Sequence, residues 1–402
     1  MNSRLDRSGA PAPACHVAIV GAGLVGMACA LGAAQAGLRV ALIGKPLGLN
    51  EPLDGPWDQR VYAISAASRR LLQALRVWDR LDPSRVAPIL DMHVFARADA
   101  ARGLHFSAYE ASAEALAWIV EHRELARVLH LALDFQQGVE RIAHEADEVT
   151  LDVEAATVGA GPDRAGRAQL VIGADGKHSL VRKAAGIESE IRSYGQHGVV
   201  ANFRGALPHG GAAWQWFTDQ GIVALLPLPG NDRSLVWSAA DDLAQELVAL
   251  DPAELARRVE AISGATTGAL APLGGARAFP LGVMRVPRIA APRLALVGDA
   301  AHLVHPLAGQ GLNLGFQDVE VLLECLAGRE SWRDCGDLVP LRRYERARAA
   351  PVQEMRLVTD GLQRLFAARQ PVLARLREDG MNLLQGLPVL KKALIRHAML
   401  GQ

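Results

Sequence analysis

The chain has 402 residues, of which 50% are hydrophobic and 21% are charged, a composition typical of folded globular proteins. This length exceeds what one compact core usually contains, so we expect two closely packed domains. The 43 basic residues balance the 43 acidic ones. Because phosphate-binding proteins usually carry a basic excess, this balance argues against nucleic acid as a principal ligand.

Cysteine usage and one uncharged stretch bear on the setting of the protein. The four cysteines contain no C-x-x-C pair and are too few for a disulfide framework, which favours a reduced, cytoplasmic setting. The same spacing argues against structural zinc, and we expect no metal. Residues 8–38 contain no Asp, Glu, Lys or Arg and imitate a membrane span. The five glycines between residues 21 and 37 instead indicate a buried strand, a turn and a helix.

The first elements follow a β–α–β pattern. Residues 16–20 form a predicted buried strand, a helix begins near Leu24 and ends around Gly37, and residues 38–43 form a second strand. This order predicts a parallel sheet.

The middle of the chain changes from helices to short strands. Apolar residues at helix-like spacing predict helices over residues 59–81 and 120–133. Short strands are predicted over residues 140–174 and, separated by Gly, Pro and Asp turns, over residues 199–240. The second group predicts an antiparallel sheet inserted into the first domain. A buried strand returns at residues 293–297, and the last part of the chain is mostly helical.

The segment Gly21-x-Gly23-x-x-Gly26 follows the first strand and opens the first helix. Gly21 allows a tight turn, Gly23 lets the backbone approach a pyrophosphate, and Gly26 lets helix and strand pack closely. The phosphates would bind free N–H groups at the helix N-terminus, where the helix dipole favours negative charge. By itself the motif predicts a dinucleotide, with a simple tight turn as the alternative.

The acidic residue that usually ends the second strand of such a motif and binds the adenosine ribose is missing. Gly44 and Lys45 stand in its place. Lys45 could bind the 2′-phosphate of NADP or lie in solvent. The ribose could instead be held through water or by Glu51 or Asp54, and the residues leave these alternatives open.

A second motif, Asp175-Gly176, follows a buried strand and precedes a predicted helix. It is either part of a ligand site or an ordinary strand-to-helix turn, because Asp-Gly is frequent in turns.

The third motif covers residues 293–318 and is the most informative. Its buried strand delivers Asp299 to the carboxyl end of the sheet, where a carboxylate can accept hydrogen bonds from sugar-like hydroxyls. Gly309 and Gly311 then permit a loop close to a flat ligand. The following helix is expected to point its N-terminus at this loop, where it would stabilise negative charge on the ligand.

In this order and at these separations, the three motifs resemble those of the group A flavin monooxygenases, the aromatic hydroxylases related to para-hydroxybenzoate hydroxylase. The chain is more closely similar to the ubiquinone-biosynthesis hydroxylase family in residues 58–65, 279–281, 302–318 and 341–348. The resemblance covers nearly the whole chain. It implies an α/β fold with a Rossmann-like FAD-binding domain around a parallel sheet, an inserted antiparallel-sheet substrate domain and a C-terminal helical segment.

We expect the FAD-binding domain to be discontinuous. It would comprise residues 14–85, 115–188 and 275–365, the substrate domain would comprise residues 86–114 and 189–274, and residues 366–402 would form the C-terminal helical region.

The resemblance assigns cofactor-binding roles to residues of all three motifs and of two segments between them. The pyrophosphate and its surroundings would be bound by Gly21, Gly23, Gly26, Arg60, and His122 or Arg123. Asp175 and Gly176 would lie in a motif shared by FAD and the nicotinamide donor. Asp299 would bind the ribityl chain. The isoalloxazine would be bordered by Pro306, Gly309, Gln310, Gly311, Leu312 and Asn313.

The resemblance also implies an activity. The protein would be an FAD-dependent monooxygenase that uses NAD(P)H and O2. It would hydroxylate the ring of a polyprenylated phenol or quinol in ubiquinone biosynthesis through a flavin C4a-hydroperoxide. The alternatives are a hydroxylase or halogenase of another aromatic substrate, and a flavin-binding subunit of a biosynthetic complex without turnover of its own.

Three further features could serve the substrate. His305 could act as a general base for a phenol or as a structural hydrogen bonder. Trp214 and Trp216 alternate along one strand and, with Leu226, are predicted to line an apolar substrate pocket. Residues 387–400 form a predicted basic amphipathic helix, which either packs as a terminal helix or contacts a membrane surface or a partner complex.

Overall fold

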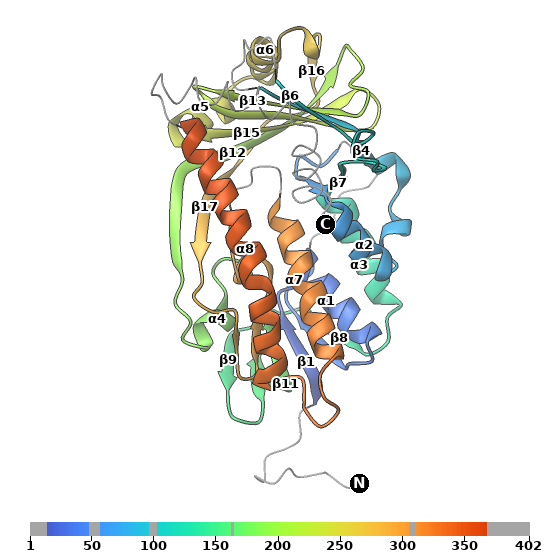
Figure 1. Ribbon diagram of the computed structural model, residues 1–402, viewed down its shortest axis with the longest axis vertical. Helices are drawn as coiled ribbons and strands as arrows, with labels where there is room; N and C mark the ends of the chain where they lie inside the picture. The colour runs from blue at the N-terminus through green and yellow to red at the C-terminus, as the bar shows by residue number, and fades with distance from the viewer. Residues whose placement is uncertain (1–13, 48–56, 96–102, 162–164, 305–309, 368–402) are drawn as a thin grey trace.

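The computed structural model describes residues 14–47, 57–95, 103–161, 165–304 and 310–367. Two large sheets, one above the other in the view of Figure 1, dominate it. The lower sheet is mostly parallel and the upper one mostly antiparallel, and a small three-stranded sheet accompanies them.

The parallel sheet has the order β18-β19-β11-β1-β2-β8. It is built around β1 (Cys15–Val20), α1 (Leu24–Gln35) and β2 (Val40–Ile43), the predicted β–α–β start. Its other strands are β8 (Val139–Ile142), β11 (Ala165–Gly173), β18 (Ala290–Ala291) and β19 (Leu294–Leu296), and β9 (Glu148–Leu151) and β10 (Ala156–Gly159) continue from β11 as antiparallel neighbours.

Alternate residues of β1 pack on opposite faces of this sheet. Val17 and Ile19 are buried with helices α1 and α7 (Gln310–Ala327), and α8 (Leu338–Ala367) packs beside α7 (Figure 1). Ala18 and Val20 are buried on the other face with β9, β10 and α4 (Leu180–Ala184). None of the helices in the described ranges is both long and apolar enough to cross a membrane.

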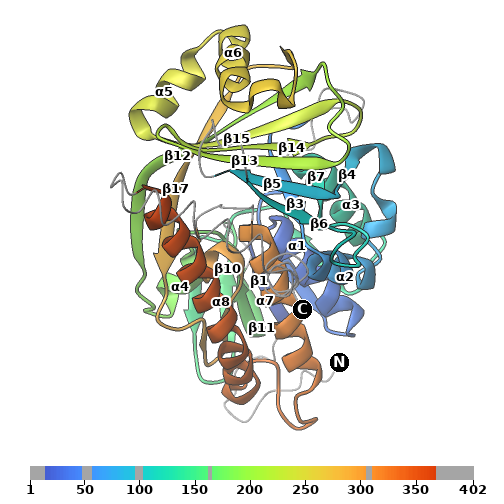
Figure 2. The same cartoon turned by 45° about the horizontal axis from the view of Figure 1, so that its top comes forward.

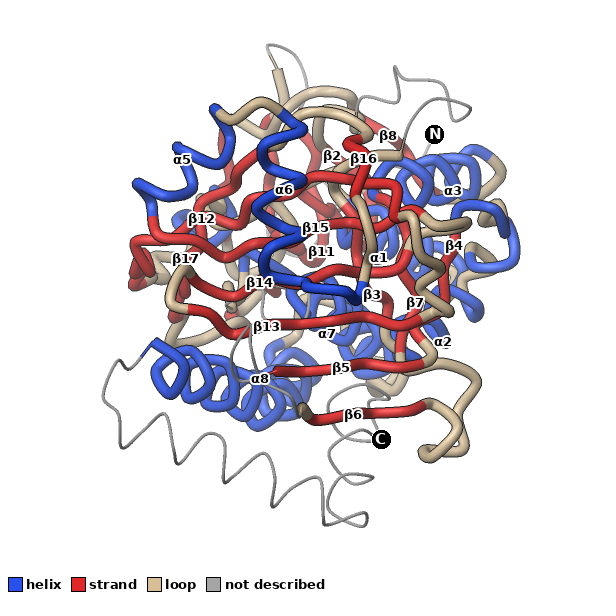
Figure 3. The backbone as a smooth tube through the Cα atoms, turned by 90° about the horizontal axis from the view of Figure 1, so that it is seen from above, coloured by secondary structure: helices blue, strands red, loops and turns tan. Residues whose placement is uncertain are grey.

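The upper sheet has the order β16-β12-β15-β14-β13-β5-β6, and β17 also pairs with β12. Its strands are β5 (Asp91–Phe95), β6 (Leu104–Ser107), β12 (Glu190–Gly205), β13 (Ala212–Thr218), β14 (Gly221–Pro227), β15 (Asp232–Ala240), β16 (Leu270–Pro272) and β17 (Arg277–Arg285). Its pairs are antiparallel except β13 with β5. Helices α5 (Asp241–Ala249) and α6 (Pro252–Ser263) cover the outer face, as Figures 2 and 3 show.

The small sheet consists of β3 (Val61–Ile64), β7 (Ala117–Glu121) and β4 (Val86–Ile89). Helix α2 (Ala66–Ala74) follows β3, and α3 (His122–Asp134) follows β7. Four single turns of 3₁₀ helix complete the described elements: Trp78–Arg80, Pro83–Arg85, Gly264–Thr266 and Gly298–Ala300.

The predicted α/β class with a parallel and an antiparallel sheet is confirmed, but two predicted helices are too long. The helix expected over residues 59–81 begins only at Ala66, because Val61–Ile64 pairs with β7 as a strand. Ser65 marks the boundary, since its hydroxyl accepts the N–H of Ser68 and caps α2. The helix expected over residues 120–133 begins at His122, after strand β7.

Two strand pairings bear on the predicted domain boundaries. Strand β17 lies in the segment 275–365 assigned to the FAD-binding domain, yet it pairs with β12 of the upper sheet. Strand β4 lies in the segment 86–114 assigned to the substrate domain, yet it pairs with β7. Both are pairings that cross the predicted boundaries, and local sequence patterns do not specify them.

Candidate cofactor-binding site

The three sequence motifs meet at one edge of the parallel sheet. Strands β1, β11 and β19 are parallel neighbours, so their carboxyl ends lie side by side. The turns that follow these strands carry Gly21, Asp175 and Asp299. Ligands of open α/β sheets bind at such an edge, and the topology therefore assembles one site from segments more than 100 residues apart.

The glycine turn has a distinct reason for each of its three glycines. Gly21 has a φ of +112°, and a Cβ there would overlap the carbonyl oxygen of Ala174. A Cβ at Gly26 would overlap the carbonyl oxygen of Gly21. Gly23, the N-cap of α1, differs because a Cβ there would meet no atom of the described residues within 4 Å. The space in front of the α1 N-terminus is therefore open to a phosphate.

Gly44 has its own conformational reason to be glycine. Its φ is +154°, and a Cβ there would lie 2.7 Å from the backbone nitrogen of Ala22. Lys45 forms an exposed ion pair with Glu145, with 3.2 Å between Nζ and Oε1. Glu51 and Asp54, the other candidates for the ribose contact, lie outside the described residues.

The Asp175 carboxylate caps helix α4. Its Oδ2 accepts the N–H groups of Leu180 at 2.6 Å and Val181 at 3.3 Å. Its buried Oδ1 has no hydrogen-bond partner in the described part of the chain. The adjacent Gly176 has a φ of +78°, and a side chain there would meet nothing nearby among the described residues. This motif thus combines a structural cap with one unused acceptor.

Arg182 links the second motif to the third. Its buried guanidinium donates to the carbonyl of Lys177 at 2.7 Å and to the carbonyl of Ala300 at 2.9 Å. Arg182 was not among the predicted site residues, and its local signal is its place in the helix after Asp175-Gly176.

Asp299 lies just after β19, in the turn Gly298–Ala300. Its side chain is solvent-accessible, but protein surrounds it closely enough for burial to raise the pKa of its carboxyl, against the opposing charges of His302, Arg60 and Lys177. An accessible carboxylate at the carboxyl end of a buried strand is suited to accept hydrogen bonds from ligand hydroxyls.

Helix α7 is fastened to β3 through Asn313. The Asn313 side chain accepts the N–H of Ser65 at 3.0 Å and donates to the carbonyl of Ala63 at 2.8 Å, so it is engaged within the protein. A Cβ at Gly311 would meet nothing within 4 Å in the described ranges. Leu312 is partly buried against the core. His305, Pro306 and Gly309 lie outside the described residues, as does the side chain of Gln310.

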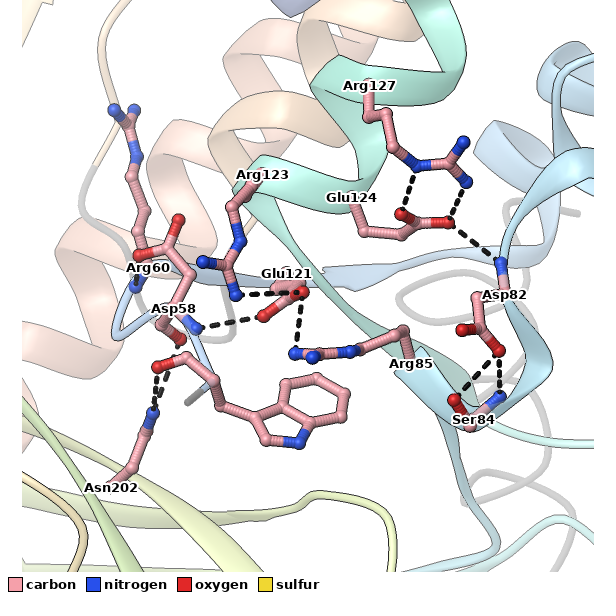
Figure 4. Close-up of polar contacts among 11 residues, drawn as sticks. Asp58, Arg60, Asp82, Ser84, Arg85, Glu121, Arg123, Glu124, Arg127 and Asn202 are labelled. Carbon is pink, nitrogen blue, oxygen red and sulfur yellow. Dashed lines mark hydrogen bonds and ion pairs between the residues drawn. The ribbon is translucent and has the colours of Figure 1, made fainter. Parts of the chain in front are cut away.

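Arg60, His122 and Arg123 separate into two environments. The Arg60 guanidinium is 5.5 Å from the centre of the Tyr62 ring, and the Tyr62 hydroxyl is 3.1 Å from His122 Nδ1. Burial raises the pKa of Tyr62 to about 12. Burial, together with the Arg60 charge, lowers the pKa of His122. Arg123 is instead buried beside Glu121, 3.7 Å from its carboxylate (Figure 4).

The two tryptophans of β13 lie on the same face of the upper sheet. Trp216 is 2% exposed and belongs to the core under α5 and α6, and Trp214 packs partly against that core. This is the outer face, which does not favour the expected role of either residue in a substrate pocket. Leu226 packs instead with the cluster of Ala87, Ile119 and Ala213, on the face toward β4 and β7.

The donor and acceptor set at this edge fits FAD. An open helix N-terminus at Gly23 suits a pyrophosphate, and the accessible Asp299 carboxylate suits a polyhydroxyl chain. The exposed Arg60 supplies a positive charge beside them.

Comparison with known proteins supports this fit. A family model described as "FAD binding domain" matches residues 14–356. Ubiquinone hydroxylase UbiL of Rhodospirillum rubrum is 37% identical over 391 residues, which cover 95% of this chain and 89% of that protein. The 3-demethoxyubiquinol 3-hydroxylase of Escherichia coli is 35% identical over 393 residues, which cover 96% of this chain and 98% of that protein.

A solved structure shares the fold. The structure of pqsL, a probable FAD-dependent monooxygenase from Pseudomonas aeruginosa, has a TM-score of 0.73 and 25% sequence identity, and the match covers 89% of this chain and 97% of that chain. These similarities confirm the resemblance that the motifs indicated. The chain therefore belongs to the FAD-binding domain family and is an FAD-dependent monooxygenase.

Proposed function

We propose that the protein hydroxylates the aromatic ring of a polyprenylated phenol or quinol in ubiquinone biosynthesis, with NAD(P)H as reductant and O2 as co-substrate. Support for this substrate class comes from similarity over more than nine-tenths of the chain to two proteins named as hydroxylases of ubiquinone or demethoxyubiquinol. The structural observation that carries the proposal is the meeting of the open Gly23 turn and Asp299 at one sheet edge.

Bound FAD supplies the redox chemistry that activates O2. The N-terminus of α1 at Gly23 would hold the pyrophosphate, with Arg60 beside it. Asp299 would accept hydrogen bonds from the ribityl hydroxyls. The N-terminus of α7, at Gly311 and Leu312, would point its helix dipole at the place where negative charge develops on the reduced ring.

The substrate ring would lie against the inner face of the upper sheet. Gln215 and Phe217 alternate with the tryptophans of β13, so their side chains point to the face opposite the core under α5 and α6. Leu226 contributes to the apolar cluster on that inner side. Apolar surroundings exclude water. Ring oxygenation requires this exclusion, because in the presence of water the activated oxygen is lost as hydrogen peroxide.

We also propose that residues 387–400, outside the described residues, bring a cytoplasmic enzyme to the membrane surface or to a partner complex. The support is the pattern of basic and apolar residues in that segment and the hydrophobicity of a polyprenyl chain. Sedimentation with anionic vesicles tests the membrane contact. A truncated chain ending before residue 387 should remain in solution, and equal sedimentation of both chains would contradict the assignment.

The activity is tested with purified protein and FAD. We expect bound flavin absorbance, NAD(P)H oxidation stimulated by a polyprenylated phenol, and incorporation of one labelled oxygen atom from O2 into the product. A chloride-dependent product would instead identify a halogenase, and FAD binding without turnover would identify a non-catalytic subunit. Deleting the gene should cause an unhydroxylated quinone precursor to accumulate. Unchanged quinone pools would contradict the ubiquinone assignment and leave FAD binding intact.

A further inference from the structure

The segment of residues 57–60 carries Arg60 and is held from the side of the small sheet by Glu121. The backbone N–H of Asp58 donates to Glu121 Oε2 at 2.9 Å. The Asp58 carboxylate in turn accepts the N–H of Arg60 at 2.9 Å, and the Arg60 carbonyl accepts the N–H of His122 at 2.8 Å. Figure 4 shows this chain of contacts from Glu121 to Arg60. The backbone of Arg60 is thus fixed although its side chain is exposed.

The buried carboxylate of Glu121 is paired with two arginines. Glu121 is the last residue of β7 and is 0% exposed. Its Oε1 lies 3.1 Å from the guanidinium of Arg85 and 3.7 Å from that of Arg123. A buried carboxylate is tolerated only when charged partners and hydrogen bonds replace water. These two arginines therefore hold the Glu121 carboxylate in the place where it can accept the Asp58 N–H.

The upper sheet holds the same segment from the other side. Asn202 on β12 donates through Nδ2 to the carbonyls of Trp57 and Asp58, each at 3.3 Å (Figure 4). The Gln59 side chain also donates to the carbonyl of Gly275, close to the start of β17. Residues 57–60 thus bridge the sheet that would bind substrate and the edge that would bind the cofactor.

We infer that Glu121 is a positioning residue that fixes Arg60 for the cofactor, and that Asn202 completes this clamp from the upper sheet. The inference rests on the proposed cofactor role of Arg60. A long side chain contributes most to affinity when its backbone is held in advance, because less conformational freedom is lost on binding. Removing the Glu121 carboxylate should therefore weaken FAD binding, although no cofactor contact is assigned to Glu121 itself.

Helix α3 offers a matched control in Glu124. It is also 0% exposed, accepts the N–H of Asp82 at 2.8 Å, and pairs with Arg127 at 2.7 Å. Figure 4 shows the two glutamates three residues apart on separate networks. Substituting Glu124 removes the same kind of interaction from a segment that does not carry Arg60.

The experiment compares Glu121→Ala, Glu121→Gln, Asn202→Ala, Arg60→Ala and Glu124→Ala. Two quantities are measured: the FAD dissociation constant, and amide hydrogen exchange of residues 57–64 in the cofactor-free protein. Glu121→Ala should raise the dissociation constant about tenfold and accelerate exchange of this segment, with Asn202→Ala in the same direction. Glu121→Gln, which keeps one acceptor oxygen, should lie between wild type and Glu121→Ala and serves if the alanine variant does not fold.

A double variant separates positioning from general damage. If Glu121 acts through Arg60, Glu121→Ala should add nothing to the loss of affinity already caused by Arg60→Ala. Full additivity, or an equal loss in Glu124→Ala, would overturn the inference. Unchanged affinity in Arg60→Ala would also overturn it while leaving the proposed function in place. Failure of the wild-type protein to bind FAD would instead contradict the proposed function.

Discussion

The backbone N–H of Gly298 donates to the carboxylate of Asp318 across 2.9 Å, which ties helix α7 to the turn that carries Asp299. The same carboxylate is 2.6 Å from His302 Nε2 and 2.6 Å from Arg348 Nε. Asp318 is fully buried, and Gly298 has a φ of +60° that the contact helps to maintain. The position of the expected ribityl acceptor therefore depends on a carboxylate that does not itself reach solvent.

Asp318→Asn should strongly destabilise the protein. The change leaves the Arg348 charge buried without its anion, a loss that typically costs about 3–5 kcal/mol of unfolding free energy. Urea denaturation monitored by circular dichroism measures it. Asp242→Asn, at an exposed position on α5, is the control and should change stability little. Similar unfolding curves for the two variants would contradict the structural role.

The same variant has a defined pH signature. Burial acts to raise the pKa of Asp318, but His302, Arg348 and the Gly298 N–H outweigh it and hold the pKa below its ordinary value. A carboxylate with a depressed folded-state pKa stabilises the protein fully above its unfolded pKa, and this stability is lost as pH falls through the folded value. The difference between wild type and Asp318→Asn should therefore shrink in acid. A difference that stays constant down to acid unfolding would argue against this linkage.

Gly23→Ala should weaken FAD binding and leave stability unchanged, whereas Gly26→Ala should lower stability. A methyl group at Gly23 meets only open space at a φ of −75°, so the cofactor-free variant should unfold at the wild-type temperature. It should nevertheless bind FAD at least about tenfold more weakly, because the methyl group occupies the approach of the pyrophosphate. At Gly26 the methyl group overlaps the Gly21 carbonyl, and such overpacking costs about 1–3 kcal/mol. Calorimetry measures the stability of each variant, and fluorescence titration measures its FAD affinity. Wild-type FAD affinity in Gly23→Ala would contradict the assignment of the pyrophosphate to this turn.

FAD affinity should weaken in acid through Asp299. Burial raises the pKa of this carboxyl, so it takes up a proton at a higher pH than an ordinary aspartate does. The protonated group accepts fewer hydrogen bonds, and affinity should fall as pH falls through this raised value. Asp299→Asn does not titrate and should bind about tenfold more weakly at neutral pH. Fluorescence titrations across the acid range should show a flat profile for the variant. Parallel profiles for both proteins would assign the pH dependence to another group.

Trp216→Ala should act on stability and leave substrate binding unchanged. The side chain is buried under α5 and α6, and removing a buried tryptophan typically costs about 3–5 kcal/mol. Trp332→Ala, at a side chain that is 73% exposed, should change the unfolding free energy by less than about 0.5 kcal/mol. The Michaelis constant for the phenolic substrate should be the same in both variants. A Michaelis constant that increases only in Trp216→Ala would instead indicate that Trp216 lines the substrate pocket.

Features that depend on a few consecutive residues could be predicted from the sequence. The glycine turn and the strand before Asp299 are such features, because a strand, a turn and a helix each leave a local pattern. The contacts of Asp58 with Glu121, and of Arg182 with the carbonyl of Ala300, join residues 63 and 118 positions apart. No local pattern specifies such pairs. The alternation of Trp214 and Trp216 likewise places both on one face of β13, but it does not indicate which face the helices α5 and α6 will cover.

Gly44 has a consequence for how cofactor analogues are discriminated. Its positive φ and the nearby Ala22 nitrogen mean that an engineered glutamate at this position would strain the glycine turn instead of restoring the usual ribose contact. Among the described residues, the groups placed at this sheet edge serve the pyrophosphate and the ribityl chain. An analogue altered in the ribityl chain should therefore compete poorly with FAD.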